Sequence, residues 1–127
     1  MDTLCTDSLL FDHTAADSEW LNKMLPQMKN HPAWQGAIDE ETAESLLQGQ
    51  APFNYLLRTG KDEHNYLLSF VTEIGAVAHS KVVMTEKVWV YYNGQSGRSP
   101  YIDRDLGGLI PVVMRCDPSQ CQPLRIL

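Results

Sequence analysis

Three nitrogen-bearing side chains stand in or beside apolar runs, where such side chains are uncommon. Arg58 ends the run Phe53–Leu57, and His79 and Lys81 interrupt the run Val77–Val83. Arginine is rarely buried without a partner. A guanidinium binds a phosphate through two parallel hydrogen bonds, and a lysine adds a compact positive charge. If the two runs are neighbours in a sheet, the three side chains form an anion site.

Predicted strands would position these side chains. Two runs rich in aromatic and branched residues flank a polar segment that contains Gly60, which predicts a β-hairpin. Two further apolar runs predict two more strands, so that the predicted strands are residues 53–57, 66–71, 77–83 and 88–92. Alternation along a strand puts His79 and Lys81 on one face, and puts Arg58 on the face of Leu56.

Two helices are predicted before the first strand. Ser18 is a candidate N-cap for a short helix that Pro26 interrupts and that ends near Asn30. Its apolar stripe is expected to pack on the domain that follows. The acidic residues of segment 38–47 favour the first turn of a second helix, which ends at Gly49.

The C-terminal third of the chain is less regular. Residues 93–100 have the composition of a loop. Asp103 is a candidate cap for a third helix that reaches Met114, although two glycines and a proline weaken it. Residues 124–127 are expected to form a last short strand. The order of helix, consecutive antiparallel strands and helix predicts an α+β fold.

Composition excludes several classes of protein. A length of 127 residues predicts one domain that needs no metal or disulfide to bury its core. The net charge of −6, with 16 acidic and 10 basic residues, argues against a nucleic-acid partner. No apolar run is long enough to span a membrane, and the N-terminus lacks the basic start of a signal peptide. We therefore expect a cytoplasmic protein.

The cysteines and histidines give little support for catalysis or for a metal. Three cysteines are an odd number, so we expect free thiols. A loop disulfide between Cys116 and Cys121 stays open for an exported protein. Nothing in the sequence places a base beside either thiol, and the histidines and cysteines lack metal-ligand spacing. We expect no enzyme activity, no cofactor and no metal site.

The order and spacing of five motifs over residues 34–127 resemble a Src-homology-2 (SH2) domain, the phosphotyrosine-recognition module. The matching segments are Trp34–Ile38, Ala43–Leu47, Tyr55–Arg58, Tyr66–Ser69 and Val77–Val82. They are similar to the family's W-x-x-G-x-I (with one residue fewer), A-E-x-L-L, F-L-V-R, Y-x-L-S and V-x-H-x-K-I. The resemblance implies a central antiparallel sheet flanked by two helices. Residues 1–33 would then be an N-terminal extension with a short helix.

The resemblance also implies roles for single residues. Arg58 would grip the phosphate from the base of a pocket, Lys81 would flank the phosphotyrosine ring, and His79 would help to order the pocket. The start of the phosphate-binding loop would supply backbone N–H groups and a hydroxyl. These loop residues are Thr59, Gly60 and Lys61.

Three positions depart from the family pattern. Glu40 stands where the family often has an arginine in its first helix, so that either Glu40 points away or Lys61 and Lys81 supply the missing charge. Gly60 stands where a serine is usual in the loop. Ser80 replaces a large aromatic residue of some members, which predicts that readout of the residues after the phosphotyrosine is weaker or is set by the loop at residues 93–100.

The sequence thus predicts a monomeric module that binds tyrosine-phosphorylated proteins or peptides, with neither nucleic acid nor membrane as a partner. An alternative is the same fold used as a phosphate-independent interaction scaffold. The acidic Glu40 suggests this alternative, because a carboxylate that faces a phosphate would repel it. A third hypothesis, an enzyme that uses Cys116 or Cys121, has little support. Small effectors of intracellular bacterial pathogens also carry this domain, so an effector acting in a host cytosol stays open as an origin.

Overall fold

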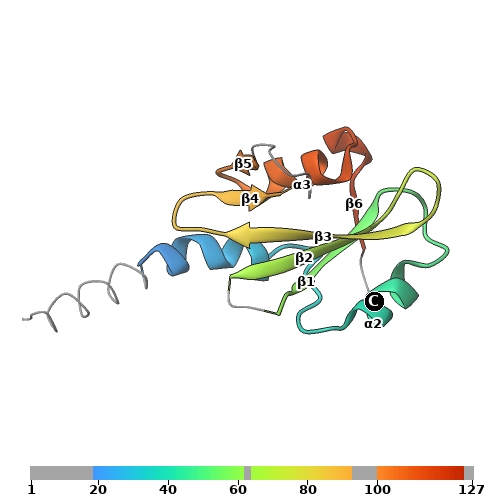
Figure 1. The fold of residues 1–127 in the computed structure, drawn as a ribbon, viewed down its shortest axis with the longest axis horizontal. Coiled ribbons are helices and arrows are strands. Elements are labelled where there is room, and N and C mark those ends of the chain that lie inside the picture. Colours follow the sequence, from blue (N-terminus) through green and yellow to red (C-terminus); the bar gives the residue numbers. More distant parts are fainter. Residues whose placement is uncertain (1–18, 62–63, 93–99, 125–127) are drawn as a thin grey trace, which may run out of the picture.

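The computed structural model describes residues 19–61, 64–92 and 100–124. In these residues one six-stranded sheet carries helices on both faces (Figure 1). The strand order is β5-β4-β3-β2-β1-β6. Every neighbouring pair is antiparallel except β1 and β6, which run parallel. The predicted α+β fold with a central antiparallel sheet is confirmed.

The elements follow the chain in a simple order. A helix over residues 19–29 comes first. The strands are β1 (Asn54–Thr59), β2 (Asn65–Val71), β3 (Val77–Met84), β4 (Trp89–Tyr91), β5 (Tyr101–Asp103) and β6 (Gln122–Pro123). The other helices are α2 (Glu40–Leu47), α3 (Leu106–Met114) and a 3-10 helix (Pro118–Gln120).

Alternation along the strands divides the core in two. Leu57 and its face of the sheet pack with helix 19–29 and α3 in the larger cluster. Leu56 and the opposite face pack against α2 in the smaller cluster. Arg58 is two residues beyond Leu56, so it lies on the α2 face.

Helix 19–29 is continuous through Pro26, which the sequence analysis expected to interrupt it. Met24 and Met28, on either side of the proline, are 1% and 0% exposed in the larger core, and this burial holds both turns against the sheet. Gln27 links the helix to the rest of the molecule. Its Oε1 accepts the Trp89 indole N–H and the Leu106 backbone N–H, each at 3.0 Å.

The start of α3 corrects another expectation. Asp103 belongs to β5 and does not cap the helix, because the N-cap is Asp105. The Asp103 Oδ1 atom instead accepts the Asp105 backbone N–H at 2.9 Å. A Cβ atom at Gly108 would collide with the Asp103 carboxylate. The glycine that weakens the helix therefore leaves room for this carboxylate.

The last strand lies earlier than expected. β6 covers Gln122–Pro123 and pairs with β1, and Leu124 then donates its backbone N–H to the Tyr55 carbonyl at 2.7 Å. The rest of the strand predicted at 124–127, and nearly all of the loop predicted at 93–100, lie outside the described residues. No described helix is long and apolar enough to cross a membrane.

Candidate functional site

Arg58 is the buried charge of the α2 face. Its side chain is only 4% exposed. β1 is paired with β2 on one side and with Trp34 and β6 on the other, so the strand is held rigidly. The apolar residues of β1 make it a central strand. This position places the guanidinium of Arg58 inside the protein.

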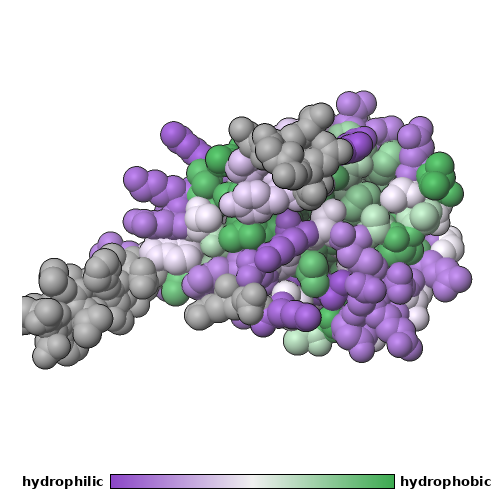
Figure 2. All heavy atoms as spheres, viewed as in Figure 1, coloured by the Kyte–Doolittle hydropathy of each residue, from purple (hydrophilic) through white to green (hydrophobic). Residues whose placement is uncertain are grey.

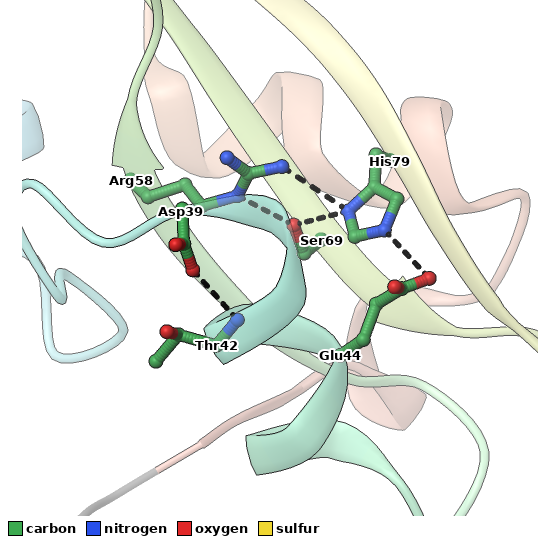
Figure 3. Close-up of polar contacts among 6 residues, drawn as sticks. All are labelled: Asp39, Thr42, Glu44, Arg58, Ser69 and His79. Carbon is green, nitrogen blue, oxygen red and sulfur yellow. Dashed lines mark hydrogen bonds and ion pairs between the residues drawn. The ribbon is translucent and has the colours of Figure 1, made fainter.

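Two hydrogen bonds fix the plane of this guanidinium (Figure 3). Arg58 Nε donates to Ser69 Oγ at 3.0 Å, and its Nη2 lies 3.3 Å from His79 Nδ1. Ser69 Oγ is 2.7 Å from the same imidazole nitrogen. Arginine can only donate, so Nδ1 must accept and the His79 proton sits on Nε2. Ser69 therefore accepts from Arg58 and donates to His79.

The strand that brings these residues together is β2. We expected an anion site if the runs carrying Arg58 and His79 were neighbours, but β2 lies between β1 and β3. The Arg58 side chain reaches across β2, and Ser69 of β2 completes the contact. In the sequence, Ser69 stands out only as part of the motif Tyr66–Ser69. Its signal was a hydroxyl within an apolar predicted strand.

His79 continues the chain of contacts to α2. Its Nε2 atom is buried and lies 3.4 Å from Glu44 Oε2, without the geometry of a hydrogen bond. The Glu44 side chain is half exposed (50%), whereas that of His79 is 15% exposed. The Nε2 atom of His79 therefore lies close to a partly solvated carboxylate.

Glu40 also faces this region. The ligand atoms of Glu40, Glu44 and His79 all lie within 4.8 Å of one another. A metal there would need a lone pair on His79 Nε2, yet the bond from Arg58 to Nδ1 puts the proton on Nε2. We therefore interpret the three residues as a polar rim of the site. Figure 2 shows hydrophilic side chains gathered over α2.

Acidic residues of α2 and its N-cap lie around the guanidinium without forming an ion pair with it. Burial lowers the pKa of Arg58, and Glu40, Asp39 and Glu44 oppose this effect in that order. Hydrogen bonds from Thr42 lower the pKa of Asp39, and the Arg58 charge contributes less. Asp39 is the N-cap of α2, with its Oδ1 accepting the Thr42 backbone N–H at 2.8 Å. An arginine in this setting stays protonated at neutral pH.

Lys81, which was predicted to flank the phosphotyrosine ring, lies two strands from Arg58 on the same face of the sheet. The strand register sets Arg58 opposite Leu67, and Leu67 opposite Lys81. A hollow of about 230 Å³ opens there, and Lys81 is exposed at it. The other residues that line it are Gly60, Lys61, Asn65, Tyr66 and Leu67.

The predicted phosphate-binding loop is only partly on this face. Thr59 shares the face of Leu57 and lines a different hollow, against helix 19–29. The backbone N–H groups of Thr59 and Gly60 already donate to the carbonyls of Gly36 and Asn65, at 3.0 and 2.9 Å. A Cβ atom at Gly60 would lie 2.7 Å from the Asn65 oxygen, so the tight turn requires glycine. Of the three loop residues, Gly60 and Lys61 remain beside Lys81.

No model of a protein family and no curated protein matches the chain. Among solved structures it is similar to the SH2 domain of a Monosiga brevicollis CRK/CRKL homologue, with 20% identity and a TM-score of 0.54, over 76% of this chain and 86% of that one. It is also similar to the SH2 domain of the human proto-oncogene protein VAV1, with 22% identity and a TM-score of 0.47. That match covers 64% of this chain and 54% of the VAV1 structure. The chain has an SH2-like fold.

Proposed function

We propose that the chain binds phosphotyrosine in tyrosine-phosphorylated proteins or peptides, with Arg58 gripping the phosphate. One observation carries the proposal. Arg58 is 4% exposed, yet among the described residues no carboxylate forms an ion pair with it. Its hydrogen-bond partners are the hydroxyl of Ser69 and the imidazole of His79, and neither group carries a negative charge. Buried charges are costly unless paired, so an anion is the ligand that this guanidinium fits.

The contacts with Ser69 and His79 use two of the five N–H donors of the guanidinium and leave three for that anion. Ser69 and His79 hold Nε and Nη2, whereas Nη1 points away from both residues (Figure 3). A phosphotyrosine phosphate carries about −1.5 to −2 charges at neutral pH. Each charge-assisted hydrogen bond to it contributes about 1.5–3 kcal/mol. Two such bonds are a large part of the roughly 8 kcal/mol that a micromolar complex needs.

The hollow along the sheet suits the ring of the ligand. The row from Arg58 through Leu67 to Lys81 crosses three strands and spans about 10 Å between its ends. An aromatic ring on Leu67 would place its phosphate toward Arg58, with Lys61 and Lys81 beside the ring. His79 would act through Arg58 by holding the guanidinium in its plane.

The test is a titration of a fluorescent, degenerate phosphotyrosine peptide pool and of its unphosphorylated twin. Arg58→Ala is expected to abolish measurable binding. Arg58→Lys is expected to abolish most of it, because an ammonium group cannot donate the two parallel hydrogen bonds of a guanidinium. Arg104→Ala, which removes the same charge from an exposed position, is the matched control and should bind like the wild type. Circular dichroism checks that each variant is folded. Wild-type affinity in Arg58→Ala would contradict the proposal.

A second candidate function is a phosphate-independent scaffold with the same fold. The observation that favours it is the acidic rim of Glu40 and Glu44, which would repel a dianion. Free phosphotyrosine or phenyl phosphate separates the two functions, because a scaffold binds neither compound. The monomeric state, the cytoplasmic location and the domain boundary at residue 34 stay predictions of the sequence.

A further inference from the structure

Two thiols on the far side of the sheet from Arg58 lie in contact. Cys116 follows α3, and Cys121 follows the 3-10 helix. Their Sγ atoms are 2.8 Å apart, and both residues are partly buried against the larger core. A disulfide bond is about 2.05 Å long, so the two sulfur atoms need to move together by less than about 1 Å.

The turn between the thiols is built by other bonds. Asp117 donates its backbone N–H to Gln120 Oε1 at 2.9 Å, and Gln120 donates its own backbone N–H to the Asp117 carbonyl at 2.9 Å. Pro118 fixes the first residue of the 3-10 helix. Arg115 ends α3 in the left-handed conformation. This scaffold brings the reduced thiols together without any covalent link.

We propose that Cys116 and Cys121 form a site of reversible oxidation, in which exchange with a small-molecule disulfide converts the two thiols into an intramolecular disulfide. In the first step the Cys116 thiolate attacks one sulfur of the small disulfide. A mixed disulfide forms, and one small thiolate leaves and takes up a proton. In the second step Cys121 gives up its proton and its thiolate attacks the Cys116 sulfur, and the second small thiolate leaves and takes up a proton. Two protein thiols are oxidised, and one small disulfide is reduced to two thiols.

The order of the steps follows from the surroundings of the sulfur atoms. Burial, followed by the hydrogen bond with Cys116, raises the pKa of Cys121 to about 12. Cys121 is therefore a poor first nucleophile at neutral pH. Once Cys116 carries the mixed disulfide, the two sulfur atoms are already adjacent. Proximity then favours closure over release of the adduct.

The bond would join the end of α3 to the start of β6. Closing this short loop restricts the unfolded chain, and we expect the melting temperature to rise by about 5–10 °C. Arg58 lies on the opposite face of the sheet, so phosphopeptide affinity should not change. The inference is therefore independent of the proposed function.

The experiment treats the full chain with oxidised glutathione and then maps its disulfides by mass spectrometry without reduction. The expected product is a monomer with a Cys116–Cys121 bond and one free thiol of the original three, and dithiothreitol should restore all three. Cys121→Ser should trap a glutathione adduct on Cys116, and the control Cys5→Ser should close the bond like the wild type. Unreacted thiols, a stable glutathione adduct on either cysteine of the wild type, or a bond to Cys5 would overturn the proposal.

Discussion

Replacing Ser69 by alanine tests whether the contacts around Arg58 form one unit. The hydroxyl accepts from Arg58 Nε at 3.0 Å and donates to His79 Nδ1 at 2.7 Å. Ser69 is completely buried (0% exposed), so water does not readily replace it. The substitution removes one small polar group and leaves a buried guanidinium nitrogen without its acceptor.

The magnitude follows from that loss. A buried donor left unsatisfied costs about 1–3 kcal/mol, and the cost is higher beside a charge. We therefore expect the free energy of unfolding to fall by about 2 kcal/mol. Without its Nε anchor the guanidinium also leaves the plane that presents Nη1. Phosphopeptide affinity should fall roughly tenfold, which corresponds to about 1.4 kcal/mol.

Urea unfolding and fluorescence polarisation with a phosphotyrosine peptide measure the two effects separately. Ser45→Ala is the matched control, because Ser45 lies exposed on α2 and should change neither quantity. A Ser69→Ala protein as stable as the control and with equal affinity would refute the argument. A loss of stability with unchanged affinity would show that Ser69 supports the fold but does not position Arg58 for the ligand.

Three other substitutions test further parts of the structure. Glu40→Arg should tighten phosphopeptide binding roughly fivefold, since exposed charge pairs contribute up to about 1 kcal/mol, and an unchanged dissociation constant would show that Glu40 does not face the ligand. Gln27→Ala removes the shared acceptor of an indole and a backbone N–H. It should lower the free energy of unfolding in urea by about 1–3 kcal/mol, and a loss below about 0.5 kcal/mol would contradict that role. Burial raises the pKa of Tyr55 from 10.0 to about 12. The free energy of unfolding that the neutral phenol contributes is therefore fully present below pH 10 and is lost as the pH rises through 12. Tyr55→Phe should remove about 3 kcal/mol of this alkaline loss, and identical pH profiles for the variant and the wild type would argue against it.

Local pattern was sufficient for most of the fold. Turn residues between apolar runs predicted the hairpin, and Gly49 follows the end of the second helix as expected, because caps and turns depend on a few adjacent residues. Alternation alone also places Thr59 on the face opposite Arg58. The family resemblance instead assigned Thr59 to the phosphate loop. The role of Thr59 in phosphate binding stays a prediction.

The sequence by itself determined that Arg58 and His79 project from strands, because alternation is a property of the backbone. Only the tertiary structure decided that β2 lies between them, that Ser69 bridges them, and that Glu40 and Glu44 lie beside His79. These contacts join residues up to 39 positions apart in the chain, and they depend on strand order and on how α2 packs against the sheet. No local pattern predicts the strand order or the packing of α2, because both depend on the energy of the whole core.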